Sequence, residues 1–507
     1  MFDNKLIAKN TIFLYVRMLI VLVVSLYTSR IVLIELGVED YGIYSVVGGV
    51  VMFFGFLNGA MVAGTQRFLS FEIGRNDFSR LKETFNAALL IHIFLAFTIL
   101  ILAETVGLWF VRFYLKIPSN RIDAALFVYH FSVFSFVVSI IKVPYNAIII
   151  ARERMYAFAY FGVFEMVLKL IAVFLLIWFS YDKLKLYSFL LFIVSIIVAL
   201  VYLIFAKRNF SETNFKLIRK RHIYKELINY SGWNLLGSFS MISKGQGINI
   251  LSNIFFGTTV NAAYAISNQI YNSVYSFVSN FQMASNPQII SNYASGNIYD
   301  MLDLVRRTSK FSFYLIFILT LPFILEIKFI LNLWLDVVPE YTVIFTILIL
   351  MNSWIDSFSS PLVTLIQATG RIKFYQIFIA TIFTLNVPIA YLLFKFGFPP
   401  ESAFISIIFI NFVALGTRLI FVKKNVPEFS ILEFLKDILW RNIPVILLSA
   451  SIPIIFKSIF ESNSLFQTLI NMLISFILSM TFVYFIGLKN NERKFVKSLL
   501  INFINKN

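Results

Sequence analysis

The chain has 507 residues, of which 59% are hydrophobic and 14% charged, with a mean hydropathy of +0.83 and 59 phenylalanines. A soluble globular protein carries roughly 25% charged residues, so this composition excludes a soluble fold and indicates a protein that lives in lipid. The net charge of +17 is explained by basic residues beside membrane spans, and we expect no nucleic-acid partner.

Apolar runs long enough to cross a hydrocarbon core of about 30 Å recur along the whole length. They predict an all-α polytopic membrane protein with about fourteen transmembrane helices. The approximate spans are 7–35, 41–68, 84–113, 124–150, 156–181, 186–206, 228–256, 262–290, 308–331, 341–368, 374–396, 402–422, 442–460 and 465–488. An even number of spans leaves both termini on the same side of the membrane.

Lysine and arginine are distributed unevenly between alternate loops, which predicts the orientation of the chain. If the N-terminus is cytoplasmic, most of the 43 basic residues fall in inner segments. These include Lys207, Arg208, Lys216, Arg219, Lys220, Arg221 and Lys225, whereas the outer loops hold chiefly Lys116, Arg121, Lys183, Lys185 and Lys457. We therefore expect both termini in the cytoplasm and the first span as an uncleaved anchor.

Short motifs recur roughly 220 residues apart, in the same order. The segment 36–44 matches 256–264 in the spacing of glycine and tyrosine, and 113–118 matches 333–339 with one insertion. At the ends of spans 4 and 10, Pro144 and 151–155 correspond to Pro361 and 368–372. The second half of the membrane domain is therefore interpreted as a repeat of the first.

Each repeat contains six spans, so the two halves are related by a pseudo-twofold axis along the membrane normal. The predicted division is a six-helix lobe over 1–206, a basic cytoplasmic linker over 207–227, a six-helix lobe over 228–422, and two extra helices with a cytoplasmic tail over 423–507. Two lobes that rock about a central cavity open it to either face of the membrane in turn, which is the mechanical requirement for transport.

Spans 7 and 8 are unusually rich in amide and hydroxyl side chains, which are costly in lipid unless they face protein or water. Asn268, Asn272, Ser276 and Asn280 recur every four residues and so share one helical face, with Tyr264 and Tyr275 near it. Such a face suits a sugar. The alternative is that these groups join helices to one another. The candidate sugar-binding residues are Asn234, Asn249, Asn268, Asn272 and Tyr275.

Most charged residues inside the predicted spans are cations, and a desolvated basic patch binds phosphate or another anion. The candidate anion-binding residues are Arg17, Arg30, Lys142 and Lys244. Arg30 lies near the outer end of its span. Extension of its side chain to the membrane–water interface is an equal alternative to anion binding. Asp356 and Glu165 are candidates for coupling to a cation or proton, although Asp356 would also suit an ion pair with a cavity cation, and Glu165 precedes Lys169 by one helical turn.

Several classes of chemistry have no support in the sequence. The absence of cysteine excludes disulfides and thiol catalysis, and His92, His130 and His222 lack the spacing of metal ligands. No glycine-rich phosphate-binding loop is present, so we expect no direct use of ATP, no cofactor and no metal. No catalytic residue is assigned, and the chain is not expected to be an enzyme.

Four stretches resemble the oligosaccharide flippases of the multidrug, oligosaccharidyl-lipid and polysaccharide exporter superfamily, which include the O-antigen flippases. They are Lys9–Thr11, Leu36–Gly42, the pair Arg67–Ser70 and Gly74–Asp77, and Ala368–Arg371. The resemblance covers essentially the full chain. It implies a twelve-helix core of two lobes with two added helices in the bacterial cytoplasmic (inner) membrane.

The resemblance also implies a substrate, a polyprenyl-pyrophosphate-linked oligosaccharide moved from the inner to the outer leaflet for O-antigen, lipopolysaccharide or related polysaccharide synthesis. Pyrophosphate would meet Arg17, Arg30, Lys142 and Lys244, glycan would meet the amides and tyrosine rings, and the tail would remain among membrane lipids. The polysaccharide polymerase machinery is a further candidate partner.

Two other functions compete with this one. A drug or cation antiporter of the same superfamily is the nearest alternative, but such proteins usually have twelve spans and an acidic first helix, whereas this helix carries Arg17 and Arg30. A polysaccharide polymerase or ligase would need a sizeable outer catalytic loop. The longest outer loop here is short, so the flippase function is favoured.

Overall fold

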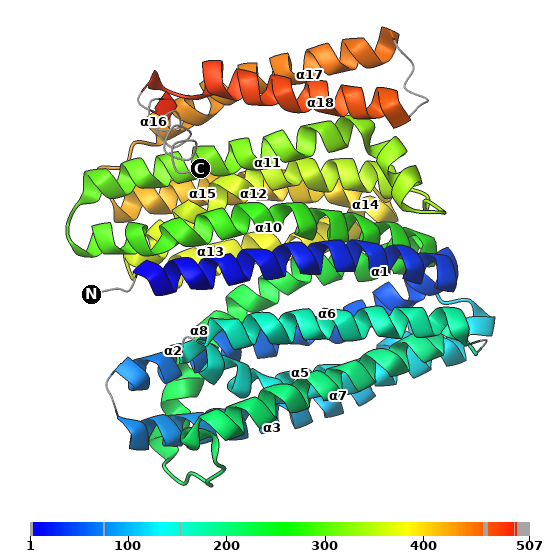
Figure 1. Cartoon of the computed structure of the whole chain (residues 1–507), viewed down its shortest axis with the longest axis vertical. Coiled ribbons are helices and arrows are strands. Elements are labelled where there is room, and N and C mark those ends of the chain that lie inside the picture. The colour runs from blue at the N-terminus through cyan, green and yellow to red at the C-terminus, as the bar shows by residue number, and fades with distance from the viewer. Residues whose placement is uncertain are drawn as a thin grey trace. The chain divides into compact units, whose positions relative to one another are not determined.

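The computed structural model describes residues 4–74, 77–152, 154–179, 181–459, 465–490 and 492–493, and within these ranges the regular secondary structure is helical. The α-helices, labelled in Figure 1, are α1 (Asn4–Phe53), α2 (Gly55–Gly74), α3 (Phe78–Leu102), α4 (Leu108–Phe113), α5 (Ile122–Ala151), α6 (Met155–Trp178), α7 (Lys183–Asn209), α8 (Arg221–Ile242), α9 (Ile248–Phe256), α10 (Thr258–Ala294), α11 (Ile298–Trp334), α12 (Thr342–Ala368), α13 (Lys373–Thr384), α14 (Asn386–Lys395), α15 (Ser402–Asn425), α16 (Ile431–Leu435), α17 (Arg441–Ile459) and α18 (Leu465–Phe482). Short π-helical segments join α3 to α4 (Ala103–Gly107), α8 to α9 (Ser243–Gly247) and α16 to α17 (Lys436–Trp440), and Val483–Gly487 extends α18.

The predicted spans all have helical counterparts among these elements, and the predicted fold class, an all-α polytopic membrane protein, is confirmed. In the described part of the chain, 11 helical stretches are long and apolar enough to cross a membrane. The α8–α9 rod and α10 are not among them, because both carry many amide and hydroxyl side chains. These two rods correspond to the predicted spans 7 and 8.

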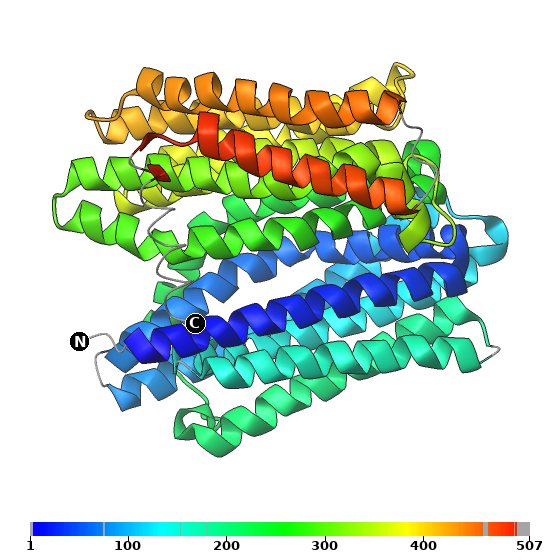
Figure 2. The same cartoon turned by 45° about the horizontal axis from the view of Figure 1, so that its top comes forward.

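The helices gather in two compact units. The first unit comprises Met1–Ile266, Leu335–Thr342 and Gln376–Ser406, so it holds α1 to α9 and the α13–α14 rod. The second comprises Ser267–Trp334, Val343–Tyr375 and Ile407–Asn507. Within the first unit α5 packs against α3 and α7, and α6 packs against α1 and α7 (Figures 1 and 2). The division into lobes at 1–206 and 228–422 stays a prediction.

The two hairpins of the proposed repeat share one backbone turn. Gly37 interrupts α1 with φ 75° and ψ 169°, and Gly257 separates α9 from α10 with φ 89° and ψ −170°. A positive φ strains any residue with a Cβ, which explains glycine at both positions. The hairpins also meet, because a Cβ added to Gly42 would lie 2.0 Å from the carbonyl oxygen of Thr258.

An arginine joins three hairpins at the end of the first unit that carries the Gly37 turn. Arg121 Nε and Nη2 donate to the two carboxylate oxygens of Asp40 at 2.8 and 2.5 Å, and Nη1 donates to Asp182 at 2.9 Å. Nearby, Lys183 Nζ lies 2.5 Å from Glu35. Bidentate pairs of this kind are stronger than single ionic contacts. We call Asp40, Arg121 and Asp182 the arginine clamp.

The clamp also depends on pH through Asp182, the N-cap residue of α7. Partial burial raises the pKa of this carboxyl, but hydrogen bonds from Arg121 and from the backbone N–H of Lys185 outweigh that effect, so the pKa lies below its ordinary value. A lowered pKa in the folded state stabilises the fold above the ordinary carboxyl pKa of about 3.9. This stabilisation is lost as the pH falls through the lowered value.

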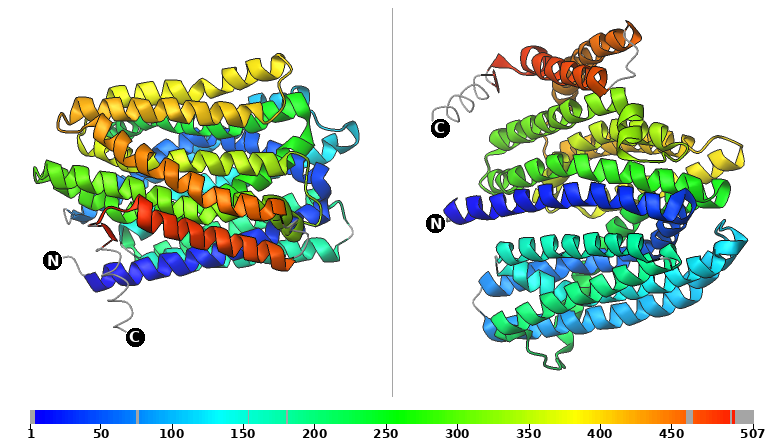
Figure 3. Two further views of the ribbon diagram at one scale, coloured as in Figure 1. Left: turned by 90° about the horizontal axis from the view of Figure 1, so that it is seen from above. Right: turned by 45° about the vertical axis from the view of Figure 1, so that its right-hand side comes forward.

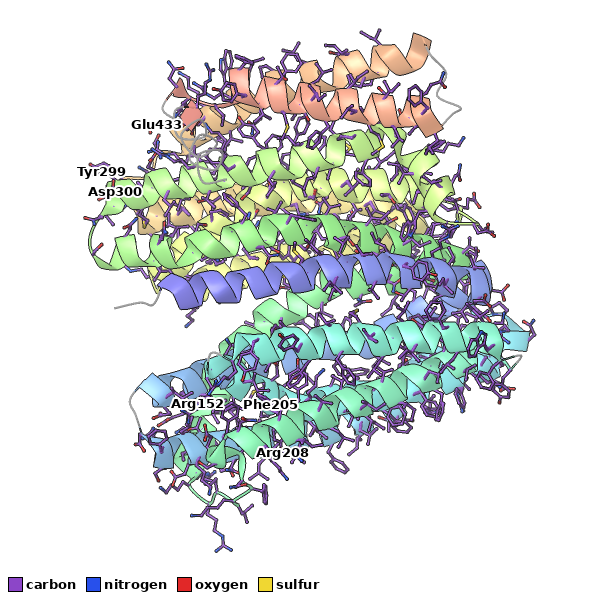
Figure 4. The ribbon with its side chains drawn as sticks, in the orientation of Figure 1. Arg152, Phe205, Arg208, Tyr299, Asp300 and Glu433 are labelled. Carbon is purple, nitrogen blue, oxygen red and sulfur yellow. The ribbon has the colours of Figure 1, made fainter. Side chains whose placement is uncertain are left out.

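The two ends of the predicted basic linker are α-helical, because α7 extends to Asn209 and α8 begins at Arg221. We call the segment between them, 210–220, the strap. It is fixed to the first unit by Asn86, whose amide donates to the carbonyls of Glu212 and Asn214 and accepts from the Lys216 N–H at 2.9 Å. Arg152 is labelled in Figure 4, and its Nη2 lies 2.6 Å from the buried carboxylate of Glu212. The strap is therefore an anchored part of the first unit.

In the second unit, α18 packs between α11 and α17, as Figures 1 and 3 show. Polar groups join these helices in a buried setting: the Asn471 amide donates to Glu326, and Lys310 Nζ lies 2.5 Å from Glu492. Lys310 and Glu492 have side chains only 4% and 7% exposed. Helix α18 and the segment that follows it are thus joined to α11 by paired polar groups.

We predict that Arg121→Gln destabilises the first unit. Glutamine cannot replace the two bidentate contacts, so Asp40 and Asp182 lose their counter-charge, at a cost of about 2 kcal/mol. The thermal unfolding midpoint of the purified protein in detergent should fall clearly. Arg112→Gln is the control, because Arg112 is exposed near the same end. An equal melting temperature for both variants would show that the clamp adds no stability.

Candidate functional site

A half-buried carboxylate in the second unit gathers polar side chains from three helices. The Asn352 amide donates to Asp356 Oδ2 at 3.0 Å, and the Tyr271 hydroxyl donates to the same oxygen at 3.3 Å. The Tyr275 hydroxyl reaches the Asp356 carbonyl at 3.5 Å. Asn411 on α15 donates to Asn352 Oδ1 at 2.5 Å. We call these five residues the Asp356 cluster.

The cluster follows from helical spacing. Tyr271 and Tyr275 lie one turn apart on α10, so their rings stack with centroids 5.3 Å apart and an angle of 12°. Asn352 and Asp356 have the same spacing on α12. Two turns beyond Asn411 on α15, buried Arg418 donates to Ser359 at 2.8 Å and to Tyr375 at 3.2 Å. A carboxylate among hydroxyl and amide oxygens at membrane depth is suited to a small cation or a proton.

Sequence reasoning found part of this site. Asp356 and Tyr275 were predicted to be functional, and the structure brings them together. Tyr271, Asn352, Asn411 and Arg418 were missed. The one available signal was the four-residue spacing that places Tyr271 beside Tyr275 and Asn352 beside Asp356. Asn411 and Arg418 had no such signal, because their contacts depend on how α15 is turned toward α12.

Lys142 has no acidic neighbour in the sequence, but the structure places one near it. Its Nζ lies 4.0 Å from Glu165 on α6 and 5.3 Å from the ring centre of Tyr202 on α7. Lys169 Nζ lies 2.7 Å from the same carboxylate. The partner was invisible in the sequence because it lies on another helix. Two lysines share one carboxylate, so this group keeps a net positive charge inside the first unit.

Lys244 lies in the π-helical segment between α8 and α9, with Nζ 4.8 Å from the ring centre of Phe383 on α13. The segment is held by the Tyr264 hydroxyl, which donates to the Gly245 carbonyl at 2.8 Å. Arg30 on α1 is exposed. Arg17 lies on α1 and Asn234 on α8, but their side chains are outside the described part of the structure.

Asn249 belongs to a chain of amides that joins elements of the first unit. It donates to the carbonyl of Ser45 at 3.2 Å and accepts from Asn261 at 2.7 Å. Asn253 donates to Asn261 at 2.9 Å and accepts from the backbone N–H of Lys116 at 2.8 Å. These buried bonds match the helix-joining alternative for span 7. On α10, Asn268 is half-buried and Asn272 exposed.

A further ionisable pair lies at membrane depth, and the sequence did not predict it. His130 Nδ1 on α5 is 3.0 Å from Glu104, which lies in the π-helical segment Ala103–Gly107. His92 is buried with Nδ1 2.8 Å from the Ala88 carbonyl, in agreement with a packing role. Among the described residues, no group of three or more His, Asp or Glu side chains is arranged to hold a metal ion.

Comparison with solved structures identifies chains of the same fold. The lipid II flippase MurJ, in an inward closed conformation, matches with a TM-score of 0.67 and 14% identity over 94% of this chain and 98% of that chain. A MOP superfamily transporter from Pyrococcus furiosus matches with a TM-score of 0.63 and 15% identity over 83% of this chain and 96% of that one. An inward-facing multidrug resistance MATE family transporter of the same superfamily matches with a TM-score of 0.64 and 14% identity over 80% of this chain and 94% of that chain.

No protein-family model matches the sequence, and a search of curated proteins gives no significant match. At 14 or 15% identity the three likenesses concern the fold alone. They agree with the superfamily that the sequence motifs suggested. The chain therefore has the fold of the MOP superfamily transporters and of the lipid II flippase MurJ.

Proposed function

We propose that the chain is a flippase that moves a polyprenyl-pyrophosphate-linked oligosaccharide from the inner to the outer leaflet of the bacterial cytoplasmic membrane. The carrying observation is the likeness to a lipid II flippase over 94% of the chain. The part of this chain outside that match is much shorter than the segment 423–507. The match therefore includes most of that C-terminal segment. The likenesses to the multidrug and Pyrococcus furiosus transporters cover 80% and 83%.

Cations at membrane depth support an anionic head group. Lys142 and Lys169 share a single carboxylate, and Lys244 lies over an aromatic ring at an irregular point of its helix. A pyrophosphate can exchange its hydration for such charges when the site excludes water. Arg17 and Arg30 on α1 are the further proposed contacts of the pyrophosphate.

Amide and aromatic groups on α10 support recognition of the glycan. The exposed amide of Asn272 is available to sugar hydroxyls, and Asn268 and Tyr275 lie near it on the same helix. Asn249 is the weakest of the proposed glycan contacts, because its amide is already bonded to Ser45 and Asn261. Asn234 completes the proposed set.

We assign ion coupling to Asp356, with Glu165 as the second candidate. The Asp356 cluster offers a carboxylate with hydroxyl and amide neighbours, whereas Glu165 is already shared by two lysines. The same cluster is the one observation that favours the alternative function, a drug or cation antiporter. A carboxylate flanked by two stacked tyrosine rings would also suit an organic cation.

We predict that deleting the gene in its host leaves full-length lipid-linked repeat units on the inner leaflet and removes the surface polymer. Mass spectrometry of membrane lipids and staining of surface glycan would measure both. Single units that are exported but not polymerised would instead point to a polymerase. An unchanged glycan profile with new drug sensitivity would favour the antiporter.

In the deletion strain, complementation by Arg17→Ala, Lys142→Ala or Lys244→Ala should export about ten- to a hundredfold less polymer than the wild type, because each loses a charged contact to pyrophosphate. Protein amount in the membrane must be unchanged. Lys216→Ala is the matched control, since Lys216 is exposed on the strap. Normal export by all three variants would refute a cationic site.

For Asp356→Asn, we predict that transport driven by an imposed ion or proton gradient is lost while the fold persists. The amide keeps an oxygen acceptor for Tyr271, so the melting temperature should move little, whereas the negative charge that holds a cation is gone. Proteoliposomes with defined gradients would measure this. Asp336→Asn, an exposed site, is the control. Unaltered gradient dependence in Asp356→Asn would exclude this carboxylate.

We also predict the orientation of the chain. A reporter fused after residue 215 should be active as a cytoplasmic fusion, and one fused near residue 120 as a periplasmic fusion, because basic residues concentrate on the cytoplasmic side. Paired alkaline phosphatase and fluorescent fusions would measure both. The reverse pattern would invert the proposed direction of flipping.

A further inference from the structure

A small polar pocket lies in the second unit, at the end where α11 begins. It has a volume of about 140 Å³ and is lined by α11, by α16 with the π-helical segment that follows it, and by the segment after Gly487. Figure 4 labels Asp300 at the start of α11 and Glu433 on α16, at the same end. These three parts of the chain meet at span ends that are predicted to be cytoplasmic.

The buried part of the pocket lining is an ion pair. Lys310 Nζ lies 2.5 Å from Glu492, and the two side chains are 4% and 7% exposed. The same carboxylate oxygen accepts the backbone N–H of Lys489 at 2.7 Å. This pair therefore forms a rigid charged wall between α11 and the segment that follows α18.

Two arginines form the accessible part of the lining. Arg307 Nη2 lies 2.7 Å from Asp303, one helical turn earlier, and Arg306 Nη1 lies 3.1 Å from Glu433. The arginine side chains are 49% and 31% exposed. A guanidinium carries several N–H donors, and among the described residues each of these two makes a single ionic contact. Further donors of both arginines are thus available to an acceptor that enters the pocket.

The charges of the lining do not cancel. Four cationic and three acidic side chains line the pocket, and the third ion pair within it joins Lys489 Nζ to Asp437 at 2.6 Å. The fourth cation is Arg306, whose partner Glu433 lies outside the lining and is 69% exposed. Water and salt screen an exposed carboxylate of this kind. The lining therefore keeps one positive charge, which favours an anion over a cation.

A phosphate group matches the size of the pocket and its donors. The volume of 140 Å³ equals the share of about four or five water molecules, which is room for a phosphorus with its oxygens and not for a nucleotide. Planar guanidinium groups can donate to two phosphate oxygens at once. Basic pockets at the cytoplasmic ends of transmembrane helices hold the head groups of anionic lipids, and a dissolved phosphate has the same chemistry.

We propose that this pocket binds a phosphate group, held by Arg306 and Arg307 beside the Lys310–Glu492 pair. The source is either the head group of an anionic phospholipid or a phosphate dissolved in the cytoplasm. The proposal does not rest on the flippase function, because these residues belong to the second unit and the proposed pyrophosphate contacts belong to the first. Its ligand links α11 to the segment after α18 and so stabilises the second unit.

Thermal unfolding of the full chain in neutral detergent tests the proposal. The probes are sodium phosphate, with sodium chloride of equal ionic strength as its control, and short-chain phosphatidylglycerol, with phosphatidylcholine of the same chains as its control. A ligand that binds only the folded protein should raise the unfolding midpoint in a saturable way. A rise with phosphate assigns a dissolved ligand, and a rise with phosphatidylglycerol alone assigns a lipid head group. If neither probe raises the midpoint above its control, the proposal is overturned.

Two variants of one ion pair should change the affinity in opposite directions. Arg307→Gln removes a donor and a positive charge, so the probe should bind at least about fivefold more weakly. Asp303→Asn removes the carboxylate that competes for Arg307, so the probe should bind about two- to threefold more tightly. Both variants break the same contact, so a merely structural pair would shift the affinity in the same direction in both. That result would overturn the proposal.

The matched control is Arg371→Gln, because Arg371 is an exposed arginine of the second unit outside the pocket lining. Its affinity for the probe should equal that of the wild type, and a loss as large as that of Arg307→Gln would overturn the assignment. The unfolding midpoints without probe show whether each variant folds. Since the assay involves no transport, absence of binding removes this inference alone, and normal glycan export in the deletion strain removes the flippase function alone.

Discussion

The structure depends on one constraint: a polar or charged group that enters the membrane must find its partner inside the protein. The hydrocarbon core offers no water to complete a hydrogen bond, so each exposed donor or carboxylate would cost several kcal/mol. The chain meets this constraint with pairs that cross between helices. Glu165 on α6 lies near Lys142 on α5, Glu326 accepts from Asn471, and Lys310 lies against Glu492. The arrangement of helices is fixed by these pairs as much as by apolar packing.

The same constraint separates structural polar groups from candidate functional ones. Asn249, Asn253 and Asn261 bond to one another and to backbone groups, so their amides are used by the fold. The Asp356 cluster differs because its carboxylate stays half-buried and its neighbours carry oxygen atoms that suit a cation. A satisfied network gives rigidity, whereas the carboxylate of the Asp356 cluster is the group to which we assign the proposed ion coupling.

The sequence was sufficient for features that are local, and insufficient for those that depend on helix rotation. Span positions were predicted because hydropathy is a property of each segment alone, and the Gly37 and Gly257 turns because their motifs repeat. The sequence could not pair Lys142 with Glu165, since nothing in either segment says which helix each side chain faces. The strap was predicted as a linker because the anchoring residue, Asn86, lies far away in the chain.

The π-helical segments connect these observations. In the first unit a tyrosine hydroxyl donates to a carbonyl of each π-helical segment: Tyr129 to Ala103 at 2.6 Å, and Tyr264 to Gly245 at 2.8 Å. Each of these carbonyls also accepts a backbone N–H, from Leu108 and Ile248 respectively, so the tyrosine adds a second bond at the wide turn. Each segment ends at a glycine, Gly107 or Gly247, where a neighbouring side chain leaves no room for a Cβ.

These same two segments carry charged side chains, Glu104 and Lys244. A widened turn shifts the register of the helix, so it can aim a charge that a regular helix would bury against its neighbour. The irregular backbone is held by tyrosine and glycine in each case, and Glu104 meets a partner on the next helix, His130, at 3.0 Å. The two irregular segments of the first unit therefore share one construction: a glycine with no room for a Cβ, a tyrosine hydroxyl on a carbonyl and one charged side chain.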